Sequence, residues 1–401
     1  MNFLQKAGYR IFQKTIYVAS PFLPWRQPKL LNFEGGIKDL AKFIKDSGRK
    51  SVLLVVGPTI SKLGMAQPFI DGCAEQGISL AVYDKVLPNP TIDAVEEALK
   101  VYNANACDCI VALGGGSSMD CAKVVGARVA RPKKPVAKMK GLLKVRKKMP
   151  MFIAIPTTAG TGSETTLAAV ISNSQTHEKY AINDHALIPH YAVMDASLTL
   201  GLPPHITSTT GMDALTHAVE AYIGKSNTFQ TKLMAEKAVK LIFENLVAAY
   251  EDGSNFKARE NMLTGSYYAG VAFTRAYVGY VHAIAHTLGG FYHTPHGLAN
   301  SVILPVVLEF YGESVYKKLA RLADIVGIAG ESDEVKAKAF IQAIKDMNKK
   351  MNIPEKFIDT IKEEDIPLMV DRAYAEAHPL YPVPKFMSKK QLEETYRKLM
   401  G

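Results

Sequence analysis

Four short apolar runs alternate with segments of helical period along the first 160 residues of the chain. The runs cover residues 51–56, 79–83, 109–113 and 151–155, and helical segments are expected over 61–76, 91–102 and 118–129. Continuous apolar runs of this length are typical of strands that are buried on both faces. A β-α-β-α order predicts an open, mostly parallel sheet that carries helices on both of its faces.

The second half of the chain has a different pattern. Beyond about residue 204 the sequence predicts helices over 210–223, 228–250, 256–275, 281–291, 312–326, 332–351 and 389–399. Only the apolar run 301–307 gives a strand-like signal there. The 401 residues are enough for two domains. We therefore predict an α/β nucleotide-binding domain over 1–195 and an all-helical domain over 196–401.

The composition indicates a globular protein without a membrane-spanning helix. The chain is 48% apolar and 21% charged, as is usual for a globular protein. No run approaches the roughly 18 apolar residues of a membrane-spanning helix, so no membrane span is expected. The mixture of basic and apolar residues over 1–16 predicts a short amphipathic helix. We expect it to dock on the body of the protein or on another subunit. The four cysteines, Cys73, Cys107, Cys109 and Cys121, have apolar neighbours and are expected to be reduced thiols of a cytoplasmic protein.

The formal net charge of +10 is partly local, because residues 131–148 contain nine Lys or Arg and no acid. A basic run of this kind can bind nucleic acid. Here it lacks interleaved aromatic residues and any nucleic-acid motif. We interpret it as a solvated loop that raises the local potential for an anionic cofactor, and we expect no nucleic-acid partner.

Two pairs of possible metal ligands recur at helical spacing. Asp213 and His217 are four residues apart, as are His282 and His286, so each pair shares one face of its helix. His296 follows after a Gly-Gly and Pro break. One carboxylate and several imidazoles form a mixed donor set that suits Fe(II), Zn(II) or Mn(II). The spacing therefore predicts a divalent-metal site.

Two loops are suited to hold a nucleotide. Gly114-Gly115-Gly116-Ser117 connects a predicted strand to a predicted helix, and Pro156–Glu164 follows the next strand. Glycines let the backbone approach a pyrophosphate, and a helix N-terminus supplies amide donors. Because both loops follow strands, we expect a nucleotide at the carboxyl ends of the sheet.

At these residues the chain resembles the iron-dependent (group III) alcohol dehydrogenase family. The resemblance rests on several stretches, namely 88–90, 114–118 with Asp120 and Lys123, 156–164, 195–200, 211–222, 272–274 and 281–300. It implies a dehydroquinate-synthase-like fold and reversible hydride transfer between a primary alcohol or aldehyde and NAD(P), with iron as the metal. It also implies a small-molecule substrate and a homodimer.

The resemblance also implies roles for individual residues. Asp213, His217, His282 and His296 match the metal ligands, and His286 matches a histidine that lines the catalytic site and relays a proton without binding metal. Phe273 matches a wall beside the nicotinamide. The positions that match cofactor contacts are Asn89, Gly115, Gly116, Ser117, Thr157, Thr158, Thr161 and Lys179.

Three departures from the family pattern bear on specificity. Gly57 stands where NAD-preferring relatives often carry an acid that binds the adenosine ribose. Gly57 is therefore expected to lie at the cofactor. Without a carboxylate there, a 2′-phosphate is not repelled, and Thr59, Ser61 and Lys62 could bind it. We therefore expect a slight preference for NADP(H) over NAD(H). Arg275 and Tyr277 are bulky for their positions. Residues 378–384 differ from the Asn-Pro-Arg type common in relatives.

Other functions stay open at this point. The nearest alternatives use the same fold, as a zinc polyol dehydrogenase of the glycerol type or a dehydroquinate-synthase-like lyase. A further alternative is a non-catalytic NAD(P)-binding or assembly protein. Zn(II) also stays possible at the metal site, since it tolerates the same ligands.

Overall fold

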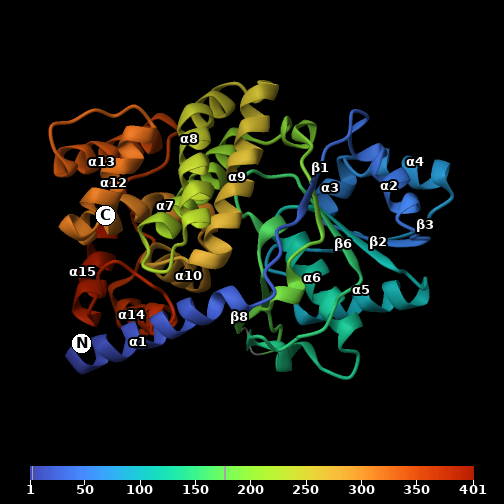
Figure 1. Cartoon of the computed structure of the whole chain (residues 1–401), viewed down its shortest axis with the longest axis horizontal. Coiled ribbons are helices and arrows are strands. Elements are labelled where there is room, and N and C mark those ends of the chain that lie inside the picture. The colour runs from blue at the N-terminus through green and yellow to red at the C-terminus, as the bar shows by residue number, and fades with distance from the viewer. Residues whose placement is uncertain (2, 176–177) are drawn as a thin grey trace. The chain divides into compact units, whose positions relative to one another are not determined.

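The structure, a computed structural model, describes residues 1, 3–175 and 178–401. The chain divides into two compact units (Figure 1): residues 24–201 form one, and residues 202–401 together with 1–23 form the other. The first unit contains a parallel sheet with helices and the second is built from helices. The predicted fold class, an α/β part followed by an all-helical part, is confirmed.

The α/β unit is built on a six-stranded sheet in the order β1-β9-β6-β4-β2-β3, and every neighbouring pair is parallel. Its strands are β1 Lys29–Leu31, β2 Ser51–Val56, β3 Ser79–Tyr83, β4 Cys109–Gly114, β6 Met151–Pro156 and β9 Tyr191–Val193. A smaller sheet contains β5 Gly141–Leu142, β8 Lys179–Asn183 and β7 Ala168–Ser172. The helices of this unit are α2 Leu40–Asp46, α3 Pro58–Lys62, α4 Gln67–Gln76, α5 Ile92–Ala104 and α6 Gly116–Ala130.

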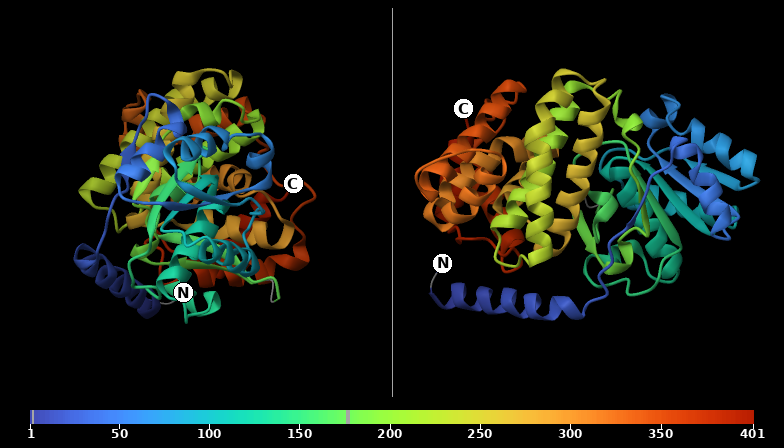
Figure 2. Two further views of the ribbon diagram at one scale, coloured as in Figure 1. Left: turned by 90° about the vertical axis from the view of Figure 1, so that its right-hand side faces the viewer. Right: turned by 45° about the horizontal axis from the view of Figure 1, so that its top comes forward.

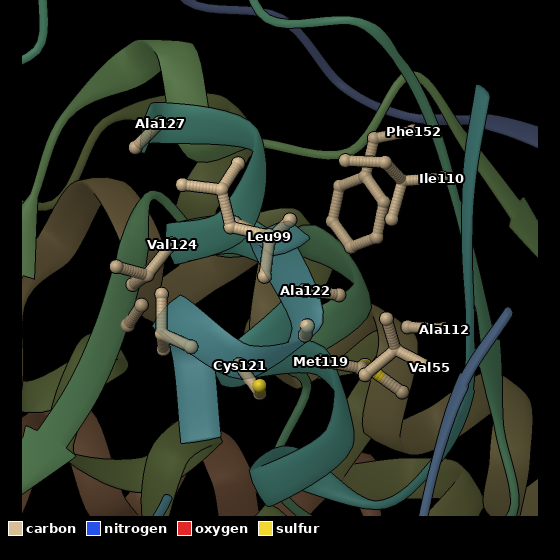
Figure 3. Packing of buried hydrophobic residues seen from close by; sticks show 14 of the residues in the cluster. Val55, Leu99, Ile110, Ala112, Met119, Cys121, Ala122, Val124, Ala127 and Phe152 are labelled. Atoms are coloured by element: carbon tan, nitrogen blue, oxygen red, sulfur yellow. The ribbon is translucent and has the colours of Figure 1, made fainter. Parts of the chain in front are cut away.

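Alternate side chains of the central strands pack into two separate cores. In β2, Leu53 and Val55 face a cluster that contains residues of α5 and α6 (Figure 3), whereas Val52 and Leu54 face a cluster with residues of α2 and α4. This division follows from the two-residue period of a strand. Because both faces of the sheet are covered, β2, β4 and β6 have no exposed residue, which explains their continuous apolar sequences.

The four predicted strands are all present, and some neighbouring elements differ from the prediction. The helix expected over 61–76 is two helices, α3 and α4, with Gly64 between them at a φ of 67°. The short strands β1, β7, β8 and β9 were not predicted. They are short or have one partly exposed face, so they lack the long apolar run that identifies β2. The four cysteines are buried free thiols, as predicted.

His190, which precedes β9, makes the α/β unit sensitive to acid. The Phe152 amide donates a hydrogen bond of 3.1 Å to His190 Nδ1, and that nitrogen can accept only when it is unprotonated. Burial, and then the nearby cations led by Arg26, lower the pKa of His190 to about 4. On acidification, the unfolded chain therefore takes up a proton near pH 6.5 while the folded unit does not.

We expect stability of the α/β unit to fall by about 2–3 kcal/mol between pH 6.5 and pH 4 because of His190. Trp25 is the only tryptophan in the chain and belongs to this unit, so its fluorescence during urea unfolding reports the change. The matched control is His190→Asn, whose amide oxygen can accept from Phe152 but does not titrate. Equal pH dependence in the two proteins would contradict this assignment.

The helical unit is assembled from ten helices in the described part of the chain. They are α1 Phe3–Ala19, α7 Pro204–Ile223, α8 Phe229–Glu251, α9 Phe256–Ala276, α10 Tyr280–Tyr292, α11 His296–Tyr311, α12 Tyr316–Ile325, α13 Asp333–Lys350, α14 Ile366–Ala377 and α15 Lys389–Leu399. Helices α8 and α9 are long neighbours (Figure 2), and α7 contacts both of them. The strand-like run 301–307 lies within α11, a correction of the prediction. Its residues are almost all buried, so the helix has no polar face to reveal its period.

The N-terminal helix α1 belongs to the helical unit, although the predicted boundaries, 1–195 and 196–401, place it with the α/β part. Gln13, the one buried residue of α1, donates 2.8 Å hydrogen bonds to the backbone oxygens of Pro379 and Tyr381. The Arg10 guanidinium lies 4.0 Å from the ring centre of Phe386. Sequence order does not reveal contacts made across more than 360 residues.

Among the described residues, no single helix is both long and apolar enough to cross a membrane. One strongly bent pair, His296–Ser314 with Tyr316–Ile325, reaches the necessary length and composition only when its two parts are taken together.

Candidate metal centre and cofactor loops

Four side chains from three helices of the helical unit meet in one cluster. They are Asp213 and His217 on α7, His282 on α10 and His296 at the start of α11. Each offers one ligand atom, and these four atoms all lie within 4.8 Å of one another. Asp213 Oδ1 is 3.5 Å from His296 Nε2 and 4.0 Å from His282 Nε2. The structure thus brings together all four residues predicted as metal ligands.

The protonation states in the cluster suit metal binding. Burial, followed by the neighbouring imidazoles, lowers the pKa of His282 well below its ordinary value. A neutral imidazole is the form that donates a lone pair to a metal. The His217 ring stacks on His282 at 4.6 Å and on Phe273 at 4.0 Å between ring centres, so packing holds its orientation.

Asn300 supplies a test of whether a cation fits the cluster. Its Nδ2 lies 2.6 Å from Asp213 Oδ1, 3.1 Å from His296 Nε2 and 3.3 Å from His282 Nε2. Three possible acceptors therefore converge on one buried amide group, which has only two N–H donors. This excess of lone pairs over hydrogen-bond donors is what a cation would balance, and one oxygen with three nitrogens suits Fe(II) or Zn(II).

Glu220 contacts the ring nitrogen of His282 that does not face the other ligand atoms. It is buried, lies one turn beyond His217 on α7, and faces His282 Nδ1 at 2.7 Å. The backbone amides of Gly279 and Val281 each donate to its carboxylate at 2.9 Å. When the carboxylate accepts the Nδ1 proton, His282 Nε2 is left with its lone pair toward the other ligand atoms. Burial raises the pKa of Glu220 to about 7, while the amide hydrogen bonds lower it.

We expect Glu220→Gln to weaken metal binding by about 10–100-fold, because the variant keeps the shape of the side chain but loses the carboxylate that accepts the Nδ1 proton of His282. Competition with a chelator, followed by metal analysis, measures this loss. The matched control is Glu236→Gln on α8, whose carboxylate accepts from Tyr222 and contacts no ligand. An unchanged metal affinity in Glu220→Gln would show that this contact does not tune the site.

His286 lies beside the cluster on α10. Its ring stacks on that of His296 with centres 5.2 Å apart, and it is about one-third exposed. It is not among the four residues whose ligand atoms converge. This position agrees with the expectation that His286 lines the site without holding the metal.

The residues predicted to bind the cofactor lie in loops of the α/β unit. Gly115 and Gly116 follow β4 and begin α6, and Gly57 follows β2. A Cβ atom added to Gly116 would lie 3.2 Å from the side chain of Thr161, and one added to Gly115 would lie 3.4 Å from Thr158. The two loops therefore lie against each other at the N-terminus of α6, and the missing side chains of these glycines allow this close approach.

Two further cofactor positions are also brought together. Lys179, at the start of β8, donates a 2.7 Å hydrogen bond to Asn89 Oδ1. Asn89 has a φ of 57°, in the left-handed region that asparagine tolerates better than most residues. Ser117 lies in the first turn of α6, and the Thr157 amide donates to the Gly114 oxygen at 3.1 Å.

A buried lysine fixes the loop over 156–166. Lys123 on α6 donates to Ser163 Oγ at 2.9 Å, to Thr166 Oγ1 at 2.8 Å and to the Ala168 oxygen at 2.8 Å. Ser163 in turn donates to Asp120 at 2.9 Å. Burial lowers the pKa of Lys123 to about 8, against the attraction of Asp120 and Glu164. This network holds the second predicted cofactor loop against α6.

The structure identifies functional neighbours that the sequence patterns did not. Glu220 could have been found from its spacing, since residues 213, 217 and 220 follow i, i+4, i+7 on one helix face. Asn300 lies four residues after His296 and shares its face of α11 in the same way.

Comparisons with known proteins agree with this geometry. A model of the iron-containing alcohol dehydrogenases matches residues 28–196, and one of the C-terminal part of the Fe-containing alcohol dehydrogenase family matches residues 207–400. Alcohol dehydrogenase 4 of Saccharomyces cerevisiae (strain YJM789) is 40% identical over 86% of this chain and 90% of its own length. The NAD-dependent methanol dehydrogenase of Bacillus methanolicus is 36% identical over 85% of this chain and 90% of its own.

A solved structure is also similar over nearly the whole chain. The crystal structure of a 1,3-propanediol oxidoreductase has a TM-score of 0.90 and 35% sequence identity, and it covers 94% of this chain and 99% of its own. Both halves of the sequence and the whole fold therefore point to one family. This chain belongs to the iron-containing alcohol dehydrogenase family.

Proposed function

We propose that this protein catalyses reversible, iron-dependent hydride transfer between a primary alcohol and NAD⁺, and that it acts as a homodimer. The observation that carries the proposal is the convergence of Asp213, His217, His282 and His296, whose ligand atoms lie within 4.8 Å of one another. In this family such a donor set is expected to hold iron. When bound, the metal supplies a Lewis acid for the alcohol oxygen, and the cofactor supplies the hydride acceptor.

The side chains of this protein orient the metal ligands, transfer the proton and bind the cofactor. Glu220 orients His282, and Phe273 holds the His217 ring by stacking. His286 takes up and releases the alcohol proton, for which an imidazole is suited near neutral pH. The loops with Gly115, Gly116 and Thr158 bind the pyrophosphate of the cofactor at the N-terminus of α6.

We propose NAD(H) in place of the expected preference for NADP(H). That expectation rested on the absence of a carboxylate at Gly57 and on Thr59, Ser61 and Lys62 as possible contacts of a 2′-phosphate. However, Ser61 donates a 3.3 Å hydrogen bond to the carboxylate of Asp84, which follows β3. A negative charge there disfavours a 2′-phosphate. The similarity to a methanol dehydrogenase described as NAD-dependent supports the same choice.

The test is anaerobic reconstitution. The protein is stripped of metal, reloaded with Fe(II) or Zn(II), and assayed for oxidation of NADH and NADPH with a panel of short aldehydes. We expect turnover with Fe(II) and a preference for NADH. A preference for NADPH would overturn the choice of cofactor, and activity with Zn(II) alone would overturn iron. Absence of turnover with either metal would favour a lyase or a non-catalytic protein, and light scattering tests the dimer.

A further inference from the structure

The imidazole of His286 is held by a carboxylate from another helix. His286 Nδ1 lies 2.6 Å from Oε1 of Glu376, which is in the last turn of α14. The Tyr381 hydroxyl donates a hydrogen bond of 2.8 Å to the same oxygen. Helices α10 and α14 pack against each other, so the contact joins two elements of one unit.

This arrangement determines which way the ring presents its nitrogens. A carboxylate accepts the Nδ1 proton, which leaves Nε2 of His286 with a lone pair to receive a proton. A second hydrogen bond on the same carboxylate oxygen restricts rotation of Glu376. A tyrosine hydroxyl donates this bond at neutral pH in any case, and burial and the nearby Glu376 raise the pKa of Tyr381 further above its ordinary value.

The segment that carries Tyr381 is itself fastened by α1. Gln13 donates to the backbone oxygens of Pro379 and Tyr381, both at 2.8 Å. Arg10 donates to the Pro384 oxygen at 3.3 Å and covers the ring of Phe386. The inner face of α1 combines these polar contacts with the ring of Tyr9, which stacks on His378 at 5.2 Å between ring centres, whereas Leu4, Ile11 and other apolar residues of this helix are exposed. Hydrogen bonds and ring contacts together therefore hold α1 on residues 378–386.

We propose that Glu376 is the positioning residue of His286, and that Tyr381 and, through the backbone of residues 379–381, Gln13 keep Glu376 in place. The proposal rests on the proposed function, in which His286 moves the alcohol proton. It assigns a role to the very segment, 378–384, that departs from the family pattern, and to the N-terminal helix.

The first test is a double-mutant cycle in the full-length, Fe(II)-loaded protein, with NADH and propanal as substrates. Glu376→Gln is expected to lower kcat by about 10–100-fold, with unchanged metal content and an unchanged KM for NADH. In a His286→Phe background the same substitution should change kcat by less than about twofold, because Glu376 acts only through His286. Tyr381→Phe is expected to lower kcat less than Glu376→Gln does, and Gln13→Leu is expected to lower it less than Tyr381→Phe does.

The control is Asp371→Asn, which removes an exposed carboxylate of the same helix that pairs with Lys389. A Glu376→Gln protein with wild-type kcat, or an equal loss of kcat in the His286→Phe background, would overturn the proposal. Loss of metal in Glu376→Gln would also overturn it, since the residue would then support the metal cluster instead.

A second readout does not require turnover. In the Zn(II)-loaded protein, a hydrogen-bonded Nδ1 proton of His286 gives a downfield proton resonance, identified by its loss in His286→Phe. We expect this resonance to disappear in Glu376→Gln and to persist in Asp371→Asn. If the wild-type protein turns over no aldehyde but shows this pattern, the proposed function fails and the positioning of His286 stands. If the resonance is unaffected in Glu376→Gln, the positioning fails regardless of activity.

Discussion

His282→Ala is expected to lose bound metal and turnover together. His282 is buried, and both of its ring nitrogens are engaged, Nδ1 with Glu220 and Nε2 with the ligand cluster. Removing it leaves three ligand atoms and a buried carboxylate without its imidazole. We expect metal content after dialysis to fall to near zero and kcat to fall by at least about 10²–10³-fold, the range for loss of a single electrostatic group. Metal analysis and steady-state kinetics measure the two effects.

His293→Asn is the matched control for that experiment. His293 follows α10, is exposed, and has a φ of 55°, a conformation that asparagine tolerates. It should keep both metal and activity. Retention of full metal content in His282→Ala would contradict the assignment of His282 as a ligand, whatever the activity.

His286→Ala is expected to separate metal binding from catalysis. The residue lies beside the cluster, but its nitrogen is not one of the four converging ligand atoms. We expect metal content to stay at the wild-type level while kcat falls by about 10²–10⁴-fold, the usual contribution of a positioned acid or base. Loss of metal from this variant would refute the role of His286 as a proton relay.

The alanine variant also removes the ring that stacks on His296, so it needs a variant that keeps the ring. His286→Phe preserves an aromatic ring and deletes both nitrogens. If kcat falls equally in the two variants, the loss comes from the missing nitrogen. A phenylalanine variant with wild-type kcat would show that stacking alone was responsible.

The local patterns of the sequence were sufficient for the fold class and for a divalent-metal site, although they did not fix every ligand. Val52–Val56 is apolar at every position because the strand is covered on both faces, and that run is visible without a structure. The pairs Asp213/His217 and His282/His286 share helix faces because four residues make about one helical turn. What spacing could not show is that His296, and not His286, completes the cluster. The family resemblance implied that choice, and the geometry agrees with it.

Contacts between distant residues were decided only by the tertiary structure. Glu220 meets His282 across 62 positions, Glu376 meets His286 across 90, and Gln13 meets Tyr381 across 368. The run 301–307 became part of a helix for a related reason, since a segment buried on all sides has no periodicity to read. Local spacing records which face of an element a residue occupies. The packing of elements alone determines what that face meets, because it depends on side chains from the whole unit.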